Sequence, residues 1–463
     1  MLETVLQRVQ NRIQCLPRFG AAQSLRRRVW QGAYWTLFGY GASQLLRFGG
    51  NLILTRLLFP ELFGLMALVN TFLLGLALLS DLGLFASTVQ NPRGSEPAFY
   101  NTVWTIQSAR GVGLWLASFV LAIPFAEFYG EPQLRWLIPV AAVSVLLAGF
   151  NSPRLYLLER DLRIRTVTKI ELGSQLCGLV VMIGWAWQAP SVWALVGGGV
   201  FGATVKLAAS HWVNRGTRNR WHWDASAARA VWAFGKWIFL ASAIGFFAEQ
   251  ADRLMLGKVA PLEILGVYGI ALTFAELPRQ ITLALANKVL FPAFSILQNL
   301  PRPALRATIA RHRAPLLYLL AGAVTALVCF GDALVRFLYD ARYWQAAWML
   351  PILALGLWPR LLCGTLEPAL FAIGKPQYTT AAQATRVVWT VGGVLLGFAL
   401  AGIFGAIVAI ALNDLLYYLV IQVGLWREGL TATRQDAQVT FVFLLLIGAV
   451  WSARVLLSGG LPH

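Results

Sequence analysis

The chain has 463 residues, of which 58% are hydrophobic and 13% charged, and its formal net charge is +18. A water-soluble protein of this length needs far more polar surface than this composition supplies. Apolar runs of about twenty residues, the length of an α-helix that crosses the hydrocarbon of a bilayer, recur along the chain. Strands of a membrane β-barrel would instead alternate apolar and polar residues over short segments. The sequence therefore predicts an all-α, polytopic helical membrane protein.

Residues 1–32 form a basic segment before the first predicted span. This segment contains Pro17 and six arginines, and the apolar run that follows contains Arg47, a pattern that does not fit a secretory signal peptide. Within the segment, VLQRVQNRIQCL has two open interpretations. It forms an amphipathic helix that lies in the membrane plane on anionic lipid, or it is a solvated tail.

Thirteen apolar segments are predicted to cross the membrane. In chain order they are 33–54, 62–84, 103–128, 134–150, 166–188, 191–212, 231–251, 265–292, 315–337, 346–372, 378–400, 403–425 and 439–457. Arginine and lysine gather in the N-terminal segment and in the loops after the fourth, sixth, eighth and twelfth spans. Because such basic loops stay in the cytoplasm, we predict a cytoplasmic N-terminus and an outer C-terminus. The positive net charge then follows mostly from topology, and no basic soluble domain is left to bind nucleic acid.

The polar residues indicate no metal or nucleotide chemistry. The four cysteines and four histidines are scattered, and their spacing matches neither a metal site nor a disulfide framework. The phosphate-binding pattern GxxxxGK[ST] does not occur in the sequence. We therefore expect no metal and no cofactor, and we do not expect an enzyme.

Two stretches of the chain resemble each other at an offset of 202 residues. They are LILTRLLFPELFG at 52–64 and LMLGKVAPLEILG at 254–266, and each joins the first and second span of a six-span set. The polar and glycine matches are Arg56 with Lys258, Glu61 with Glu263, and Gly64 with Gly266. A cation, an acid and a glycine at the same place in both halves indicate an internal duplication.

Six spans per half is an even number, so the two halves enter the membrane from the same side as parallel repeats. We predict an N-terminal six-helix lobe at 33–212, a cytoplasmic linker at 213–230 and a C-terminal six-helix lobe at 231–425, with a central cavity between the lobes. Residues 426–463 supply a cytoplasmic loop and a thirteenth helix, whose role the sequence does not assign. Paired lobes of this kind are typical of alternating-access transporters.

Several predicted spans contain charged residues, and each charge at a helix centre costs about 2.5–3.5 kcal/mol on insertion scales. Five cations have no obvious partner at helical spacing: Arg47, Arg110, Lys236, Arg360 and Arg386. Surplus arginine around a cavity favours an anionic substrate such as a phosphate, so these five are our candidate substrate-binding residues. The alternative is that each forms a structural pair between helices.

The acids of the spans divide into two groups. Glu276 with Arg279, and Asp332 with Arg336, have the spacing of ion pairs within one helix, which favours a structural role. Asp81, Glu249 and Glu367 are candidates for ion coupling. In the stretch GFFAEQADRLMLG, Asp252 and Arg253 are expected to fix the outer end of the seventh span. Glu249 lies about one turn deeper without a like-spaced cation and is expected to titrate.

Five stretches of the sequence carry a family resemblance: NLILTRLLFPELFGLMALVNTFLLGLALLSDLGL, YNTVWTIQSARGVGLWLASFVLAIPFAEFYGEPQL, LLERDLRIR, ADRLMLGKVAPLEILGVYGIA and VLFPAFS. They resemble the polysaccharide transporter family, the branch with colanic-acid-type exporters and O-antigen flippases, within the multidrug/oligosaccharidyl-lipid/polysaccharide exporter superfamily. The resemblance covers about residues 30–425. It implies two six-helix lobes in a V shape around the cavity.

The resemblance also implies a function. Undecaprenyl-pyrophosphate-linked sugar repeat units would be flipped from the cytoplasmic to the periplasmic leaflet of a bacterial inner membrane by a monomer. Enzymes of polysaccharide polymerisation and export are then candidate partners. An acid that exchanges protons, or the membrane potential acting on the anionic head at about 2.3 kcal/mol per charge per 100 mV, would drive transport.

Three other functions remain open. A drug or metabolite exporter on the same fold would have a more acidic or apolar cavity, since its substrates are usually cations. A membrane glycosyltransferase, polymerase or ligase would need a large outer loop with catalytic or metal-binding acids, whereas the outer loops here are short. A scaffold protein would tolerate removal of the charges inside the spans.

Overall fold

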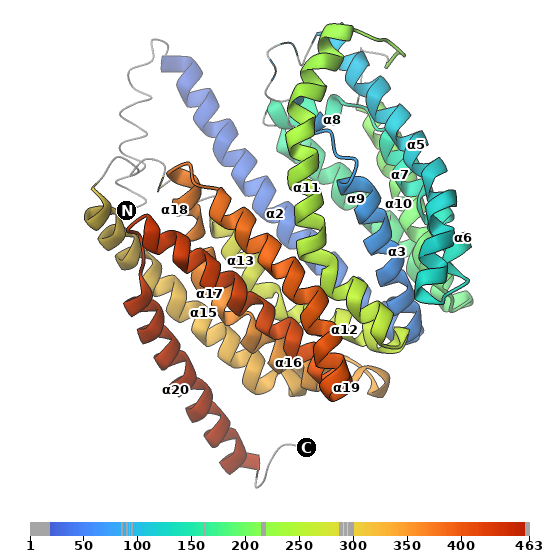
Figure 1. Cartoon of the computed structure of the whole chain (residues 1–463). Helices are drawn as coiled ribbons and strands as arrows, with labels where there is room; N and C mark the ends of the chain where they lie inside the picture. The colour runs from blue at the N-terminus through green and yellow to red at the C-terminus, as the bar shows by residue number, and fades with distance from the viewer. Residues whose placement is uncertain are drawn as a thin grey trace. The chain divides into compact units, whose positions relative to one another are not determined.

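The computed structural model describes residues 19–84, 87–88, 91, 93, 96–161, 163–213, 219–286, 290, 294 and 301–458. All regular elements of this part of the chain are helical, as the sequence predicts (Figure 1). The stretch VLQRVQNRIQCL, predicted as an in-plane helix or a tail, lies outside the described residues.

The helices of the first half of the chain are α2 (Phe19–Leu57), α3 (Pro60–Leu78), α5 (Pro97–Tyr129), α6 (Leu134–Ala141), α7 (Val143–Gly149), α8 (Arg154–Arg160), α9 (Ile164–Gln188), α10 (Val192–Trp212) and α11 (Ala225–Val259). Those of the second half are α12 (Leu262–Ala275), α13 (Leu277–Leu285), α15 (Arg302–Leu338), the 3-10 helix η3 (Ala341–Tyr343), α16 (Ala346–Gly356), α17 (Trp358–Gly364), α18 (Glu367–Ala372), α19 (Gln377–Arg427) and α20 (Thr433–Ser458).

Eight helices of the described residues are long and apolar enough to cross a membrane. A ninth is added if the bent pair Leu134–Gly149 and Arg154–Arg160, with 60° between its parts, is one span. The remaining predicted spans coincide with other helices: 33–54 lies within α2, 231–251 lies within α11, and 265–292 overlaps α12 and α13. The chain is thus a multi-pass helical membrane protein.

Helix α19 contains two predicted spans, 378–400 and 403–425, and the break between them is where the sequence places it. Ala401 and Gly402 leave the helical conformation, and Gly402 has φ +60°, in the left-handed region that favours glycine. The two halves then run antiparallel, with Gly397 against Gly405 near the turn and Tyr378 against Gly424 at the far end. Absence of side chains at the turn lets the two backbones touch.

The chain forms two compact units, which do not coincide with the predicted lobes. Unit 1 consists of residues 1–58 and 68–246, and unit 2 of residues 59–67 and 247–463. The start of α3 therefore belongs to unit 2, and the first part of α11 to unit 1. The lobe boundaries at 33–212 and 231–425 stay predictions.

Small residues bring the helices of unit 1 together. A Cβ added to Gly178 of α9 would lie 2.8 Å from the carbonyl oxygen of Gly198, and one added to Gly198 of α10 would lie 2.7 Å from that of Gly178. Gly111 of α5 and Gly149 of α7 meet in the same way, with 2.9 Å from an added Cβ to the partner Cα. Such backbone contacts give close packing between apolar helices in a solvent that is itself apolar.

Part of the predicted cytoplasmic linker lies along the first turns of α5, within unit 1. Three of its backbone N–H groups donate to side-chain oxygens of that helix: Arg220 to Asn101 (3.1 Å), His222 to Thr105 (3.1 Å) and Asp224 to Thr102 (2.9 Å). We call residues 219–224 the linker strap. Asp224, at its end, pairs with Arg93 at 3.1 Å. Residues 219–224 of the predicted linker therefore form a strap on α5.

In unit 2, the two repeated stretches meet at equivalent positions. A Cβ added to Gly64 would collide with the carbonyl oxygen of Leu262, and one added to Gly266 would collide with that of Pro60. Residues 60 and 262 are themselves equivalent at the offset of 202 residues. A reciprocal contact of this kind is what a duplicated segment related by a two-fold rotation would produce.

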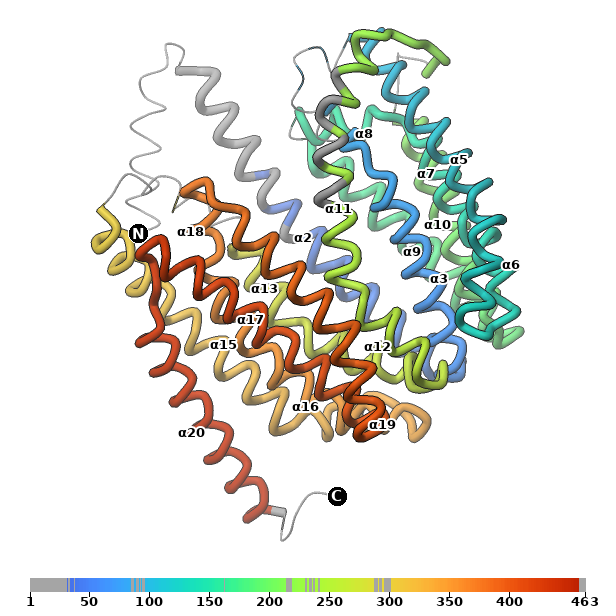
Figure 2. The backbone as a smooth tube through the Cα atoms, viewed as in Figure 1, coloured from blue at the N-terminus to red at the C-terminus, as the bar shows by residue number. Residues whose placement is uncertain are grey.

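Helix α20 packs along α15, and α15 also packs against α16 (Figure 2). The predicted pair of Asp332 with Arg336 is wrong, because Asp332 instead accepts from Arg454 of α20, at 2.6 and 2.7 Å. The Arg336 guanidinium lies over the ring of Trp344 at 5.7 Å. The thirteenth helix therefore supplies a partner that spacing within one helix could not reveal.

Candidate functional site

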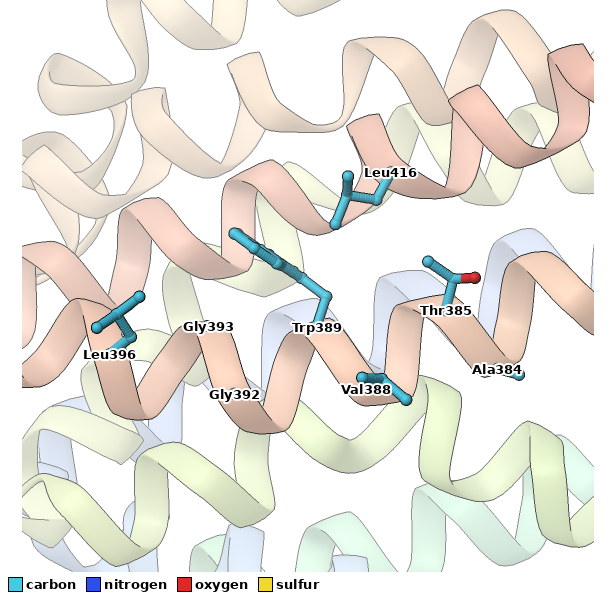
Figure 3. A pocket seen from close by; sticks show the side chains of 8 residues that line it. All are labelled: Ala384, Thr385, Val388, Trp389, Gly392, Gly393, Leu396 and Leu416. Carbon is cyan, nitrogen blue, oxygen red and sulfur yellow. The ribbon is translucent and has the colours of Figure 1, made fainter.

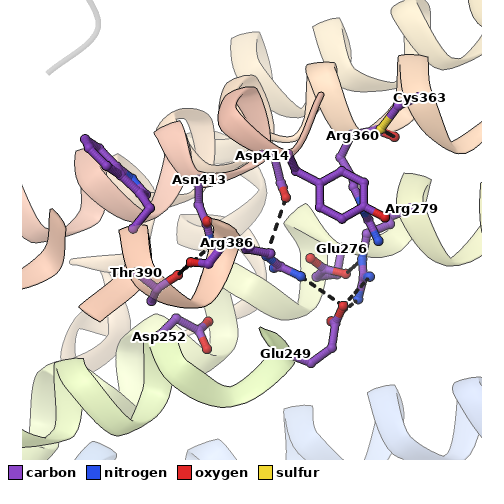
Figure 4. Close-up of polar contacts among 12 residues, drawn as sticks. Glu249, Asp252, Glu276, Arg279, Arg360, Cys363, Arg386, Thr390, Asn413 and Asp414 are labelled. Atoms are coloured by element: carbon purple, nitrogen blue, oxygen red, sulfur yellow. Dashed lines mark hydrogen bonds and ion pairs between the residues drawn. The ribbon is translucent and has the colours of Figure 1, made fainter. Parts of the chain in front are cut away.

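Charged side chains from α11, α13 and α19 meet inside unit 2 (Figure 4). Glu249 of α11 lies at the centre, and its carboxylate accepts from Arg279 of α13 at 3.0 Å and from Arg386 of α19 at 2.9 Å. Arg279 also pairs with Glu276, as the sequence predicts. Three helices are thus joined through one carboxylate.

Arg386 bridges the two halves of α19 as well. Its Nε lies 3.8 Å from an Oδ atom of Asp414, which the turn at Gly402 brings back beside the first half of the helix. Next to this pair, the Asn413 amide and the Thr390 hydroxyl are hydrogen-bonded at 2.8 Å. The side chains of Arg386 and Asp414 are 12% and 13% exposed, so the pair is largely shielded from solvent.

Arg360 of α17 completes the group. Its guanidinium stacks on the ring of Tyr417, 3.5 Å from the centroid, and the Tyr417 hydroxyl donates to Glu367 of α18 at 2.8 Å. The Arg360 Nη1 atom is buried and has no hydrogen-bond partner among the described residues. Leaving a buried donor unpaired is costly, so this N–H is available to a ligand that brings an acceptor.

We call these side chains the unit 2 charge network. It comprises three arginines, Arg279, Arg360 and Arg386, four acids, Glu249, Glu276, Glu367 and Asp414, and Tyr417. Four of the eight site residues predicted from the sequence lie in it: Arg360, Arg386, Glu249 and Glu367. An anion entering this network meets guanidinium groups that already bind carboxylates, so it has to displace an acid or use the unpaired donor of Arg360.

From the sequence alone, neither Arg386 nor Glu249 is assigned an ion-pair partner, and in the structure they pair with each other across 137 positions. This contact is the structural pair between helices that the sequence left open as the alternative. A role of either residue in transport stays a prediction. Asp252, expected to fix the end of its span, accepts from the buried hydroxyl of Tyr268, and Arg253 donates to Gln250 at 2.9 Å.

The other predicted site residues lie in unit 1. Arg110 of α5 donates to the Ser80 hydroxyl at 3.0 Å and to the Ala77 carbonyl at 2.6 Å, so it binds a carbonyl in the last turn of α3. Asp81 follows directly and accepts from the Gly83 N–H at 2.9 Å. Arg47 of α2 is exposed. Lys236 is part of α11, but its side chain is outside the described residues. The role of each in binding stays a proposal.

An apolar groove with a volume of about 670 Å³ runs along the first half of α19 (Figure 3). It is lined by Ala384, Thr385, Val388, Trp389, Gly392, Gly393, Leu396 and Leu416. Its two polar side chains are internally satisfied, because Trp389 donates to the Ala409 carbonyl at 2.9 Å and Thr385 to that of Ala381 at 3.0 Å. The lining therefore suits hydrocarbon.

Sequence reasoning missed Tyr417 and the partnership of Asp414. A charge inside an apolar span singles out Asp414, whereas a tyrosine in a helix gives no such signal. Among the described residues, no group of three or more His, Cys, Asp or Glu side chains could hold a metal ion.

Comparison with known proteins places the chain among polysaccharide biosynthesis proteins. Two curated relatives are the succinoglycan biosynthesis transport protein ExoT of Rhizobium meliloti, 24% identical over 78% of this chain and 73% of ExoT, and the lipopolysaccharide biosynthesis protein WzxC of Escherichia coli, 24% identical over 60% of this chain and 56% of WzxC. A third is the teichuronic acid biosynthesis protein TuaB of Bacillus subtilis, 21% identical over 64% of this chain and 61% of TuaB.

Solved structures share the fold at low sequence identity. The lipid II flippase MurJ in an inward closed conformation has a TM-score of 0.69 at 10% identity, over 91% of this chain and 92% of MurJ. An inward-facing multidrug resistance transporter of the MATE family, in the MOP superfamily, has a TM-score of 0.65 at 12% identity, over 86% of this chain and 95% of its own. The family model described as polysaccharide biosynthesis protein matches residues 53–348, well over half of the sequence. The chain therefore belongs to the polysaccharide biosynthesis protein family.

Proposed function

We propose that this protein is a flippase that moves polyprenyl-pyrophosphate-linked oligosaccharide repeat units from the cytoplasmic to the periplasmic leaflet by alternating access. Its cargo would be a building block of a surface or exported polysaccharide. The observation that carries the proposal is the unit 2 charge network, three arginines inside the apolar helices of a polysaccharide biosynthesis protein. Arginine suits this cargo because its planar fork matches phosphate oxygens.

The network supports a mechanism based on exchange of ion pairs. A pyrophosphate oxygen accepts first from the unpaired Nη1 of Arg360. It then competes with Glu249 for Arg386, and Glu249, once released, exchanges a proton with solvent. When the head leaves, Glu249 pairs again with Arg386. Glu249 and the pyrophosphate head thus alternate on the Arg386 guanidinium. This exchange couples release of the head to proton transfer at Glu249 without any covalent step.

The apolar groove on α19 supports the lipid half of the cargo. Its lining presents no unpaired polar atom, as a surface against a hydrocarbon chain requires. A polyprenyl chain that stays in lipid while its head crosses would lie against such a surface. The head and the chain would then meet different faces of the first half of α19.

The experiment that tests the function is a deletion followed by analysis of lipids. Removing the protein should lead to accumulation of one lipid-linked oligosaccharide in the cytoplasmic leaflet, with loss of the corresponding polymer. Re-expression should reverse both. Unchanged lipid-linked oligosaccharide and polymer levels would reject the proposal.

A second candidate is an ion-coupled exporter of drugs or metabolites, favoured by the likeness to a multidrug transporter at a TM-score of 0.65. Its four network carboxylates would have to bind a cation, although three arginines already occupy them. Accelerated efflux of a lipophilic cation from vesicles would support this candidate, and efflux independent of the protein would exclude it.

We place the protein in a bacterial inner membrane with its N-terminus in the cytoplasm, acting as a monomer and as a transporter without enzyme activity. The proposed partners are the lipid-linked glycan, anionic lipid, and enzymes of polymerisation and export. The basic loops support this orientation.

A further inference from the structure

A buried ion pair fastens the start of α20 to α15. Arg313 and Asp436 are 2.7 Å apart, and their side chains are 0% and 3% exposed. The second carboxylate oxygen of Asp436 accepts from Tyr418 at 2.9 Å and Gln422 at 2.7 Å, both on α19. Burying two charges is tolerated only when further hydrogen bonds satisfy them, and these donors satisfy one oxygen of Asp436, while the other faces Arg313 in the ion pair.

The same guanidinium reaches the break between α17 and α18. Arg313 donates to the Thr365 hydroxyl and to the Leu362 carbonyl, both at 3.0 Å. Leu362 belongs to the last turn of α17, where carbonyls without a helical partner attract a cation. Arg313 thus holds the break, and Asp436 of α20 balances the charge of Arg313.

The helices on either side of this break carry two residues of the unit 2 charge network. Arg360 lies two residues before Leu362 on α17, and Glu367 begins α18 two residues after Thr365. A shift of the break would move the guanidinium that stacks on Tyr417 and the carboxylate that accepts from Tyr417.

We infer that Asp436 is a positioning residue of the substrate site: through Arg313 it fixes the α17–α18 break and thereby sets Arg360 and Glu367. The inference rests on the proposed function, since it assigns a role in cargo binding to a residue of the thirteenth helix that does not touch the cargo. The thirteenth helix, unassigned from the sequence, is on this view a brace for the network.

A second ion pair provides the matched control. Asp332 and Arg454 also join α15 to α20, at 2.6 Å, and Arg454 donates to the Cys329 carbonyl. No contact of this pair reaches α17 or α18 in the described residues. Its loss should weaken the attachment of α20 and leave the break in place.

The native Cys363 reports on the break directly. It lies on α17 between Arg360 and Thr365, and it is fully buried. In the full-length protein in detergent, with Cys363 as the only cysteine, its alkylation by N-ethylmaleimide measures local opening of this helix. This readout needs no substrate.

Asp436→Asn should raise the alkylation rate of Cys363 by roughly ten- to a hundredfold, the effect of losing a hydrogen-bonded charge partner on a local opening equilibrium. Tyr418→Phe, which leaves the ion pair intact, should give a smaller rise. Asp436→Glu should retain most of the protection. The double variant Asp332→Asn/Arg454→Gln should alkylate at the rate of the parent.

The second measurement is polymer export per molecule of membrane-inserted protein. It should fall in Asp436→Asn and stay at the parent level in the Asp332→Asn/Arg454→Gln variant. Unchanged alkylation in Asp436→Asn, or an equal rise in the control variant, would overturn the inference. If Asp436→Asn does not accumulate, the same comparison is made with Tyr418→Phe, and parent-level alkylation there is the contrary result.

The two proposals fail in different ways. If the flippase proposal alone is wrong, deletion leaves lipid-linked oligosaccharides unchanged while Asp436→Asn still exposes Cys363. If the positioning role alone is wrong, deletion causes the expected accumulation while Cys363 stays protected in Asp436→Asn.

Discussion

The buried arginines of unit 2 differ in how fully they are paired. Arg386 bridges Glu249 and Asp414, and Arg279 bridges Glu249 and Glu276. Arg360 contacts an aromatic face and retains an unpaired donor. At the scale of single residues, function is therefore expected to depend most sharply on Arg360.

Arg360→Ala should lower polymer export by about ten- to a hundredfold, the effect of losing one charge-assisted hydrogen bond to the cargo. Arg360→Lys should restore only part of this loss, because lysine keeps the charge but not the planar fork. Export per membrane-inserted molecule is the measurement. Parent-level export in Arg360→Ala would make this arginine a structural residue only.

Glu249→Gln should lower the free energy of unfolding by about 1–3 kcal/mol, toward the lower end because Glu249 is one-third exposed. Arg279 and Arg386 each lose an ionic acceptor in this variant, while Arg279 keeps Glu276 and Arg386 keeps Asp414. Thermal unfolding in detergent measures the change, and the pH dependence of export should also flatten.

Glu171→Gln is the control for this variant. Its partner Lys206 is 3.7 Å away and both side chains are exposed, so its removal should have little effect. Equal stability of the two glutamine variants would contradict the central position of Glu249.

The linker strap should depend on pH through Asp224. The N–H and hydroxyl of Ser226, followed by Arg93, hold the pKa of the Asp224 carboxyl below its ordinary value. A depressed pKa in the folded state stabilises the strap above the ordinary pKa of about 3.9, and this stabilisation is lost as the pH falls through the depressed value.

Protection of the His222 and Asp224 amides from hydrogen exchange, corrected for the intrinsic rate, should therefore be constant between about pH 5 and 8. Asp224→Asn should lower it throughout that range. Protection in the parent that falls already near neutral pH would indicate that a different group controls the strap.

At the scale of elements, the groove on α19 can be filled without a clash. A Cβ at Gly392 meets no atom within 4 Å, and the same holds for Gly448 on α20, the matched control. Gly392→Leu should lower export by roughly three- to tenfold, since each displaced CH₂ of the cargo loses about 0.8 kcal/mol. Gly448→Leu should export normally, and equal export by both would remove the groove from the transport path.

The sequence predicts elements well where one physical rule decides. Apolar length located most of the spans and placed the break inside α19 between residues 400 and 403. The bend between α7 and α8 and the division of 346–372 into α16, α17 and α18 were not predicted, since packing against neighbours decides such breaks. Likewise, charges in apolar spans singled out four network residues as site candidates, but their partners on other helices could not be predicted.

At the scale of the whole molecule, the alternating basic loops predict which loops face the cytoplasm. Cysteines at Gln133 and at Arg220, in a variant without Cys177, should react with an impermeant thiol reagent from outside and inside respectively. Gln133 is preferred to Gly130, whose φ of +71° would strain a cysteine. Labelling of both positions from the same side of the membrane would contradict the predicted topology.

The reciprocal contact at Gly64 and Gly266 has a consequence for how the gene tolerates change. Each glycine faces the backbone beside the other, so a methyl group at either position is excluded by the same crossing. A scan of all single substitutions should therefore show two intolerant positions 202 codons apart with matching profiles. The double variant Gly64→Ala/Gly266→Ala should lose less free energy of unfolding than the two single variants together, because either substitution alone already forces the two backbones apart. The ancestry of the two halves would then be visible in mutational data alone.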